Sequence, residues 1–289
     1  MISLTRKLIV IALSIVTSIA LAYSLFGLGF MVCTTPQATS LIGGTFSGWE
    51  HATYPEEDMA QIAEAVRSFS IEGTSSEELY NTIFTALQET QPQIAALFEA
   101  GSTQDNTIDT SLLESTNLAQ LEEEYSLPRN ALSHLQDCTP IFTTGRISVG
   151  VVGAFGIAGL VALGILAGRK RLGGTLIAAS SLVIVVLVAL GVWAAVDFNG
   201  IFTWMHTLLF AQGNWIFDAD SLLITLFPEA FWAAMAGLWI ISSVVLAFIT
   251  GIIGKILPVN QYGEPPLERC LRRSDGSTGA VSPLEPSSR

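Results

Sequence analysis

The stretch FNGIFTWMHTLLFAQGNWIFDADSLLITLFPEAFW, residues 198–232, lies between the last two long apolar runs of this 289-residue chain. It contains one of the chain's three histidines and three of its six tryptophans. Two aspartates, a Gly-Asn pair and a Pro-Glu pair interrupt its apolar residues. Tryptophan is enriched where a membrane meets water. We therefore expect this segment to lie at one surface of a membrane, held there by the rest of the chain.

Four apolar runs are each about 20 residues long, the length that an α-helix needs to cross a bilayer. Half of all residues are apolar and only 13% are charged, which is unusual for a soluble protein. The first run resembles a secretory signal, but it is too long and no Ala-x-Ala site follows it, so we expect a retained helix. Bulky side chains at 30–32 argue against a lipoprotein attachment site at Cys33. The four runs are Leu8–Val32, Val149–Ala167, Thr175–Val196 and Phe231–Ile253.

Basic residues predict the orientation of these helices. Cytoplasmic loops of membrane proteins carry an excess of Lys and Arg. Here the basic residues fall before helix one, between helices two and three, and after helix four. Both termini are therefore predicted to be cytoplasmic, with residues 33–148 and 197–230 outside. The basic residues in question are Arg6, Lys7, Arg169, Lys170, Arg171, Lys255, Arg269, Arg272 and Arg273.

The pattern predicts an α-helical membrane protein with four transmembrane helices. An extracytoplasmic domain is inserted between helices one and two, and a re-entrant or interfacial segment joins helices three and four. The predicted parts are the cytoplasmic N-terminus with helix one (1–32), the acidic extracytoplasmic domain (33–148), helices two and three (149–196), the extracytoplasmic interfacial segment (197–230), helix four (231–257) and a disordered cytoplasmic tail (258–289).

The predicted extracytoplasmic domain is strongly acidic, with 17 Asp and Glu against three Arg. A solvated surface is the plain interpretation, and repulsion of anionic polymers or capture of cations is the alternative. Its first part, Thr34–Trp49, is rich in Thr, Ser and Gly and is predicted to be loop or strand. Apolar residues then recur at helical spacing from Met59 to Phe69 and from Leu79 to Leu87, and Pro55 with its following acids marks a helix start. The polar stretch Gly101–Thr110 is predicted to be a loop.

The domain ends with LPRNALSHLQDCTPIF, residues 127–142, predicted to be a short helix whose first turn contains Pro128. His134 and Asp137 are three residues apart and share a helix face. The carboxylate could orient the imidazole and stabilise its charged form, or the pair could be an ordinary surface contact. Cys33 and Cys138 are both predicted outside, either as a disulfide or as two thiols.

The quoted segment itself predicts a helix with one polar and aromatic face around His206. This helix is predicted to end at Gly213–Asn214, because glycine readily takes the left-handed conformation. The run Leu222–Phe227 is too short to cross a bilayer and is predicted to dip into the membrane or lie flat on it. Pro228 and Glu229 then start helix four. The predicted face comprises Asn199, Phe202, Thr203, His206, Phe210 and Gly213.

Motif searches exclude several chemistries. The sequence has no Gly-x-Ser-x-Gly, no Walker phosphate loop, no His-Glu-x-x-His and no Gly-x-Gly-x-x-Gly after a strand. A net charge of -12 excludes a basic nucleic-acid face. His134 and His206 remain, and two histidines can act as base and acid near neutral pH without a covalent step. Interfacial anchoring is one alternative, and a metal site is another. The possible metal ligands are His134, His206, Asp218, Asp220 and Glu229.

Residues 198–232 resemble the signature of the bacterial integral membrane family that includes the lipoprotein intramolecular transacylases. The signature has an aromatic helix with a central His (Phe202, His206, Phe210), then an Asn-Trp-x-Phe-Asp turn (Asn214, Trp215, Phe217, Asp218), and an apolar run closed by Leu-Phe-Pro-Glu-x-Phe (residues 226–231). A His-x-x-Asp element before helix two matches His134 and Asp137. The chain departs from the pattern at Ser75–Thr110, which matches nothing in it, at Ala219, where Pro is expected, and at Cys138, where an aliphatic residue is expected.

The resemblance implies an acyltransferase at the outer leaflet of a bacterial cell membrane that needs no cofactor. Its partners would be diacylglyceryl-modified lipoproteins and membrane lipid, not nucleic acid. The sn-2 acyl chain would move to the amine of the N-terminal cysteine. His206 would take the amine proton, and His134, held by Asp137, would assist the glyceryl oxygen or the oxyanion, or the two roles would be exchanged. Asn214 would donate to the oxyanion and Trp215 would shape the pocket, while Asp218 and Glu229 would support the site. The rival hypotheses are a non-catalytic membrane protein that binds an envelope partner and a metal-dependent interfacial hydrolase.

Overall fold

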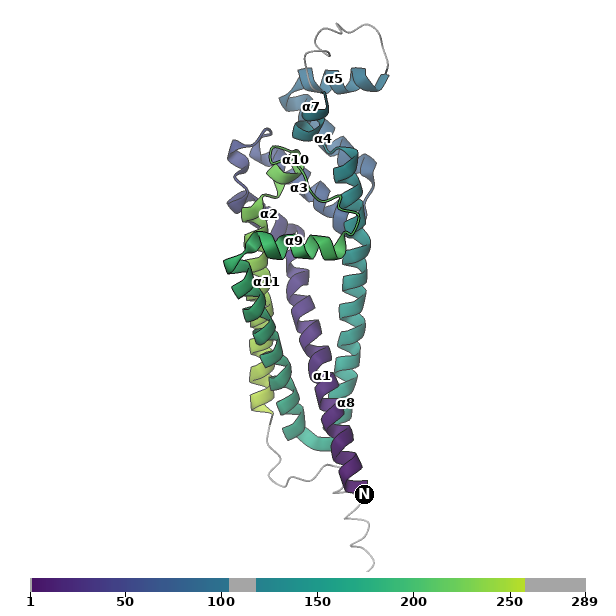
Figure 1. Ribbon diagram of the computed structural model, residues 1–289, viewed down its shortest axis with the longest axis vertical. Helices are drawn as coiled ribbons and strands as arrows, with labels where there is room; N and C mark the ends of the chain where they lie inside the picture. Colours follow the sequence, from purple (N-terminus) through teal and green to yellow (C-terminus); the bar gives the residue numbers. More distant parts are fainter. Residues whose placement is uncertain (1, 104–117, 258–289) are drawn as a thin grey trace, which may run out of the picture. The chain divides into compact units, whose positions relative to one another are not determined.

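The computed structural model describes residues 2–103 and 118–257, and nearly all of them are helical (Figure 1). No β-strand occurs in these ranges. Three of the helices are long and apolar enough to cross a membrane: α1 (Ile2–Cys33), α8 (Arg129–Val196) and α11 (Glu229–Ile256). The predicted loop Gly101–Thr110 is wrong at its start, because residues 101–103 belong to helix α5 (Pro92–Thr103). The rest of that loop and the predicted tail at 258–289 lie outside the described residues.

Helix α8 contains both the second and the third predicted apolar runs. Its continuity is interrupted at Gly168, where φ is 77° and ψ is 178°. A residue with a side chain rarely adopts this positive φ, whereas glycine does so without steric cost. The predicted short helix at 127–142 is not separate, because α8 starts at Arg129 after Pro128 and continues through Pro140. His134 therefore stands on the same helix as the following apolar run.

The chain packs as two compact units. The first unit comprises residues 1–24, 151–184 and 246–289, and the second comprises 25–150 and 185–245. In the first unit, small residues allow close helix packing, as is common in lipid: a Cβ on Gly159 would collide with Thr17, and one on Gly173 would collide with the backbone of Gly254. The hydroxyl of Ser18 also donates to the carbonyl of Thr175 at 3.1 Å.

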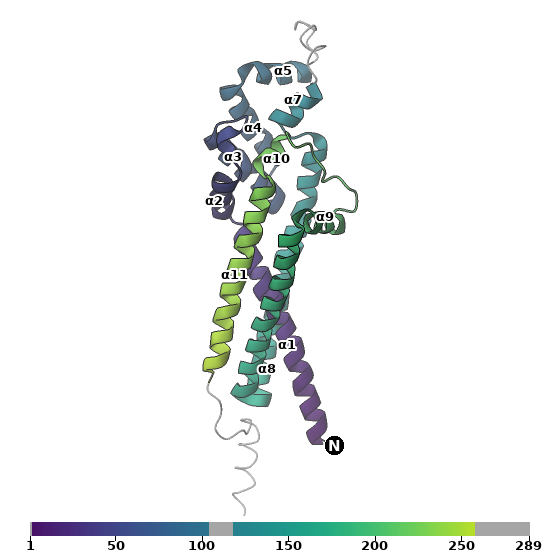
Figure 2. The ribbon, with the colours of Figure 1, turned by 60° about the vertical axis from the view of Figure 1, so that its left-hand side comes forward.

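The second unit contains most of the shorter elements. They are α2 (Pro36–Phe46), the 3-10 turn η1 (Trp49–His51), α3 (Glu56–Arg67), the π-helical turn η2 (Ser68–Glu72), α4 (Ser76–Thr90), α5 (Pro92–Thr103), α7 (Leu118–Tyr125), α9 (Phe198–Leu209) and α10 (Leu222–Leu226). In Figures 1 and 2, α9 runs crosswise to the part of α11 that belongs to this unit.

The prediction of loop or strand at Thr34–Trp49 is wrong, because helix α2 occupies most of this stretch. Thr35 caps the helix by accepting a hydrogen bond from the backbone of Ala38, and Pro36 stands in the first turn, where its missing N–H has no cost. Gly43 leaves room for the ring of Trp49, which a Cβ at this position would strike. Gly43, one of the glycines that made the stretch look irregular, is therefore a packing position in a helix.

The predicted helices with apolar spacing are confirmed. Helix α3 begins after Pro55, and its Met59, Ile62 and Val66 are buried, as are Leu79 and Ile83 of α4. Arg67 is also buried, and its guanidinium donates to the carboxylates of Glu64 and Glu72 and to the carbonyl of Thr34. A buried charge of this kind needs such partners.

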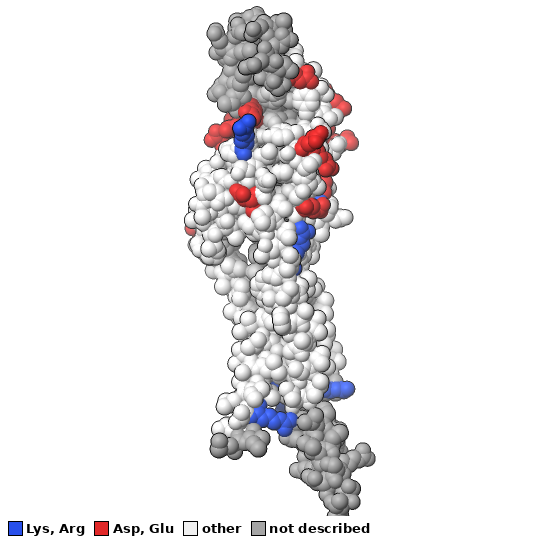
Figure 3. Space-filling view, turned by 90° about the vertical axis from the view of Figure 1, so that its right-hand side faces the viewer, with Lys and Arg blue, Asp and Glu red and all other residues white. Residues whose placement is uncertain are grey.

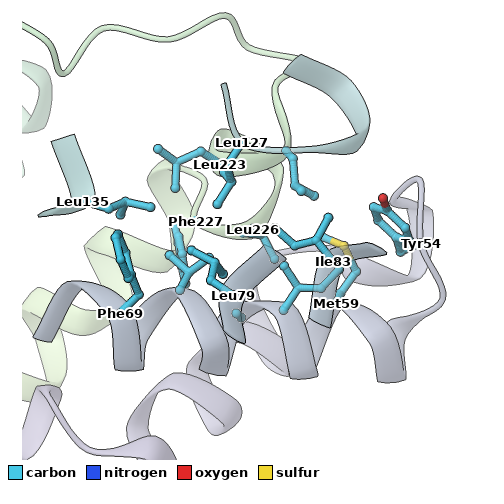
Figure 4. Close-up of a cluster of buried hydrophobic side chains, with 14 of the residues drawn as sticks. Tyr54, Met59, Phe69, Leu79, Ile83, Leu127, Leu135, Leu223, Leu226 and Phe227 are labelled. Carbon is cyan, nitrogen blue, oxygen red and sulfur yellow. The ribbon is translucent and has the colours of Figure 1, made fainter. Parts of the chain in front are cut away.

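The prediction that the run Leu222–Phe227 dips into a membrane or lies flat on it is wrong, because the run is buried inside the second unit. Leu222 and Leu226 are 1% and 0% exposed, and α10 belongs to the same buried cluster as Met59 and Ile83 (Figure 4). The indole of Trp49 donates to the carbonyl of Leu226 at 3.2 Å. The apolar run is short because it fills the core of the second unit.

The charged residues divide between the units. In its described residues, the first unit has Lys and Arg but no Asp or Glu. The second unit has many acids, and its only Lys or Arg residues are Arg67, Arg129 and Arg146. On the face shown in Figure 3, the Asp and Glu side chains belong to the second unit.

Candidate active site

The two histidines predicted to act together lie side by side in the second unit. His134 stands in the second turn of α8, and His206 stands near the end of α9. Their ring centroids are 6.0 Å apart and their planes differ by 29°, although 72 residues separate them in sequence. Each side chain is 8% exposed. Both lie outside the four apolar runs.

Helix α9 places His206 by its amphipathic pattern. Asp197 caps the helix, accepting from the N–H of Gly200 at 2.8 Å. His206 and Phe210 face inward and are buried, whereas Trp204 and Leu208 on the other side are 51% and 66% exposed. An apolar exposed face on such a helix is typical of a helix lying in a membrane interface.

The predicted end of this helix needs correction, and its predicted face is only partly buried. Asn199 and Thr203, predicted on the same face as His206, are exposed. The helix ends at Leu209, four residues before the predicted Gly213, because Phe210 leaves the helical conformation. Gly213 does take the left-handed conformation, with φ 75°, but in the turn that follows the helix.

Aromatic rings surround the two imidazoles. Phe210 lies 4.5 Å from His134 and Phe217 lies 5.7 Å from it, measured between ring centroids. Phe202 lies 4.1 Å from His206, and Trp215 lies 5.0 Å from it. These rings exclude water from the imidazoles, which disfavours the charged form of each.

The backbone fixes the tautomer of His206. Its Nδ1 lies 2.9 Å from the carbonyl oxygen of Phe202. Because a carbonyl only accepts hydrogen bonds, Nδ1 must carry the proton. Nε2 then has a free lone pair and can accept a proton from a substrate.

Asp137 does not hold His134 directly, in contrast to the simplest interpretation of their spacing. Its Oδ2 accepts hydrogen bonds from Gln212 Nε2 at 2.7 Å and from Asn214 Nδ2 at 3.0 Å. Asn214 Nδ2 also lies 3.5 Å from the hydroxyl of Ser133. The carboxylate thus fastens the turn after α9 to the start of α8. Nothing in the sequence pointed to Gln212.

Two buried polar atoms at this site lack a hydrogen-bond partner within the described ranges: His134 Nδ1 and Asn214 Oδ1. Such atoms are rare in native proteins and call for a functional explanation. The amide hydrogens of Asn214 are already directed at Asp137 and Ser133. Its spare capacity is therefore that of an acceptor, whereas the predicted oxyanion role required a donor.

Burial keeps both imidazoles neutral. It is the largest cause that lowers the pKa of His134 to about 4, and the neighbouring His206 lowers it further. The Asp137 carboxylate and the side chain of Asn214 act in the opposite direction. Burial likewise lowers the pKa of His206, while its contact with the Phe202 carbonyl raises it. Near pH 7 both rings are proton acceptors.

The other predicted site residues lie elsewhere. Asp218 is exposed and shares a hydrogen bond with Glu123, which raises the pKa of that glutamate. Glu229 is exposed in the first turn of α11. Across residues 2–103 and 118–257, no three His, Cys, Asp or Glu side chains come close enough together to hold a metal ion. The ligand set proposed for a metal-dependent hydrolase is therefore not assembled.

The two cysteines predicted to lie outside are free thiols rather than a disulfide. Cys33 lies 3.5 Å from the carbonyl of Met235, and Cys138 lies 3.3 Å from the carbonyl of His134. The second contact is the ordinary one between residues four apart on a helix.

Comparison with known proteins decides the family. The family model described as lipoprotein intramolecular transacylase Lit matches residues 80–232, which is more than half of the chain and includes both histidines. The chain belongs to this family. Lit proteins of known structure share the fold: the membrane-integral Lit from Bacillus cereus is 15% identical, with a TM-score of 0.58 over 94% of this chain and 100% of that one.

A second solved structure, a variant of the Bacillus cereus Lit with one histidine replaced by alanine, is 16% identical to this chain. Its TM-score is 0.51, and the match covers 89% of this chain and 97% of that one. No curated protein matches the chain in sequence. At this identity the likeness shows the fold, so this chain is a helical membrane protein of the Lit family.

Proposed function

We propose that this protein moves the sn-2 acyl chain of a diacylglyceryl-modified lipoprotein to the α-amino group of that lipoprotein's own N-terminal cysteine. The ester bond to the glyceryl oxygen breaks, an amide bond forms, and the glyceryl oxygen leaves with a proton. Membership of the Lit family supports the class of reaction. The stacked pair of buried, neutral imidazoles is the observation that carries the proposal.

His206 is the base that prepares the nucleophile. The α-ammonium group of a protein has a pKa of about 7.7–8.0, and it must lose a proton before its nitrogen can attack the ester carbonyl. His206 Nε2 has the lone pair for this step, because Nδ1 is occupied by the Phe202 carbonyl. The same contact stabilises the imidazolium that forms, and so does the nearby C-terminus of α9. The proton then passes to solvent.

His134 transfers the second proton. When the tetrahedral intermediate collapses, its nitrogen must lose one proton and the glyceryl oxygen must gain one. We assign both transfers to His134 Nε2. A conjugate acid whose pKa is about 4 returns its proton readily to an alkoxide leaving group. No acyl-enzyme is needed, because donor and acceptor belong to one molecule and their positioning supplies much of the rate.

Asn214 orients His134. A His134 tautomer with its proton on Nδ1 would donate to Asn214 Oδ1, which satisfies both unpartnered atoms and leaves Nε2 free. Asp137 holds the amide of Asn214 in place. Asp137 thus acts on the imidazole through Asn214 rather than by direct contact. The arrangement is analogous to the His–Asn pair of papain-like proteases.

The surroundings suit a lipid substrate at a membrane surface. Trp204 and Leu208 of α9 expose apolar surface for contact with lipid, and Trp215 beside His206 offers a wall for an acyl chain. We place four crossings in the membrane, with α8 contributing two of them on either side of Gly168. The basic residues 169–171 between these two crossings are then cytoplasmic, and both histidines are on the outer side.

The proposal is tested with purified protein in lipid vesicles and a diacylglyceryl lipopeptide whose sn-1 and sn-2 chains differ in length. Mass spectrometry is expected to find the sn-2 chain on the cysteine nitrogen. His134→Gln and His206→Gln should each slow the transfer about 10²- to 10⁴-fold, the usual contribution of general acid–base catalysis. His51→Gln is the matched control, because its side chain is 86% exposed and outside the site.

Three outcomes would count against this assignment. If both histidine variants keep the wild-type rate, the acid–base mechanism is wrong. If the wild-type protein leaves the lipopeptide unchanged, a non-catalytic role in binding an envelope partner is favoured. If a chelator abolishes activity and a divalent ion restores it, the metal-dependent alternative is correct.

A further inference from the structure

We infer that the first unit contains a binding site for an anionic phospholipid, separate from the histidines. A cleft of about 660 Å³ opens between α1 and the residues of α8 around Gly168. This volume is typical of small-molecule sites. One part of its wall is apolar, and its edge carries Arg169, Lys170 and Arg171. All of the lining residues belong to the first unit.

The basic edge of the cleft favours an anion. Arg169, Lys170 and Arg171 are all exposed, and the described residues of the first unit contain no Asp or Glu that could neutralise them. They also form the first turn of the helical segment that restarts after the non-helical Gly168. The free N–H groups and the dipole at the start of a helix attract negative groups, phosphate above all.

The apolar wall of the cleft fits an acyl chain. Ile15 and Ile19 of α1 face Ala178 and Leu182 of α8 across it. Ile15 and Ile19 are each 55% exposed and Leu182 is 37% exposed. The hydroxyl of Ser18, also in the lining, already donates its proton to the carbonyl of Thr175. The wall therefore offers apolar contact beside a charged edge.

The combination selects a phospholipid over a soluble anion. A free phosphate would use the three basic side chains and leave the apolar wall bare, and a zwitterionic lipid would use the wall without favouring the charges. Basic pockets between membrane helices are known to bind anionic head groups. Phosphatidylglycerol has both the charge and the chains that this cleft accommodates. The inference does not depend on the acyl transfer proposed at the histidines.

The test uses the full-length protein in neutral detergent. It is mixed with equal amounts of phosphatidylglycerol and phosphatidylethanolamine with identical acyl chains, and native mass spectrometry counts the bound lipids. The wild-type protein is expected to prefer phosphatidylglycerol. The double variant Arg169→Gln/Arg171→Gln should lose roughly fivefold of this preference for each basic side chain removed. The matched control Lys7→Gln/Lys255→Gln removes the same charge from the first unit outside the cleft and should keep the preference.

A charge-neutral variant separates the cleft from general surface attraction. Ala178→Trp fills the cleft without changing any charge and should abolish the preference. If it does not fold, Gly174→Leu replaces it, because a Cβ at Gly174 meets no atom within 4 Å. The inference is overturned if the filled cleft keeps the preference, if the Lys7/Lys255 control loses as much as the Arg variant, or if inorganic phosphate displaces the lipid.

Discussion

The titration of His134 offers a direct test of how the candidate site is built. The chain has three histidines, so ¹³C-labelled histidine gives three ring signals in a full-length NMR sample, with exposed His51 as a reference for assignment. The pKa of His134 is expected to be about 4 rather than the ordinary 6.5. At 1.36 kcal/mol for each unit, placing a charge on this imidazole costs about 3 kcal/mol more than in water.

Two substitutions should move this pKa in opposite directions. Asn214→Leu removes an amide that favours the charged ring, so the pKa of His134 should fall below its wild-type value. His206→Phe keeps the site apolar but removes the neighbouring imidazole that opposes the charge, so the pKa should rise. Gln212→Leu is the matched control for Asn214→Leu. Gln212 also donates to Asp137, but it is exposed, so its loss should change the pKa little.

The outcome for Asn214→Leu tests whether Asn214 orients His134. If the pKa of His134 is unchanged or higher in this variant, Asn214 does not interact with the imidazole and its orienting role is wrong. If Gln212→Leu lowers the pKa as much as Asn214→Leu, the effect belongs to the fixed turn and not to the amide oxygen. A wild-type pKa near 6.5 would show that the imidazole is not desolvated.

Three further predictions concern stability, each measured by thermal or denaturant unfolding in detergent. The folded-state pKa of His134 lies below the unfolded value, so the stability that the neutral imidazole contributes is complete above pH 6.5 and is lost as pH falls toward 4. At pH 5 the loss amounts to about 2 kcal/mol. His134→Phe should reduce this pH dependence of stability, and an unchanged profile would contradict the assignment. Trp49→Phe removes the buried hydrogen bond to the Leu226 carbonyl and should destabilise the protein by about 1–2 kcal/mol, whereas no loss would show that the bond contributes nothing. The pKa of Glu123 is raised by its hydrogen bond to Asp218, so the proton shared by the two carboxyl groups stabilises the protein at acid pH and is lost as pH rises. Glu123→Gln keeps a hydrogen-bond donor at every pH and should stabilise the protein at pH 7 but not at pH 4. An equal effect at both pH values would refute the shared proton.

The helices that could be predicted from the sequence are those whose signals, such as apolar spacing or a starting proline, lie within the helix itself. Spacing of apolar residues identified α3 and α4, and Pro228 with Glu229 identified the start of α11. Helix α2 was missed because its glycines lower helix propensity. Its Gly43 is needed for contact with Trp49, which lies outside the helix. A requirement set by a tertiary neighbour leaves no periodic signal in the sequence.

The run Leu222–Phe227 shows a related limit. An apolar run of this length is compatible with burial in protein or in lipid, and hydrophobicity alone does not distinguish the two. In the structure, α10 is packed in one buried cluster with side chains of α3 and α4, and its last carbonyl, that of Leu226, accepts a hydrogen bond from the indole of Trp49. The distinction depends on which apolar helix faces in the preceding hundred residues remain uncovered. A short window of sequence around the run does not contain that information.

The residues of the candidate site could be predicted from the sequence, but the contacts among them could not. The spacing of three residues predicted that Asp137 contacts His134, because contacts between residues three or four apart on a helix are the ones that sequence distance specifies. The carboxylate instead binds Asn214, which is 77 residues away. Neither α8 nor α9 alone would bury an imidazole: His134 is desolvated by Phe210 and Phe217, and His206 is covered by Trp215. The low pKa that makes both rings neutral is therefore a property of the packed pair. In the proposed mechanism, the two imidazoles 6.0 Å apart in an apolar setting each take a proton-transfer role that neither helix could supply in isolation.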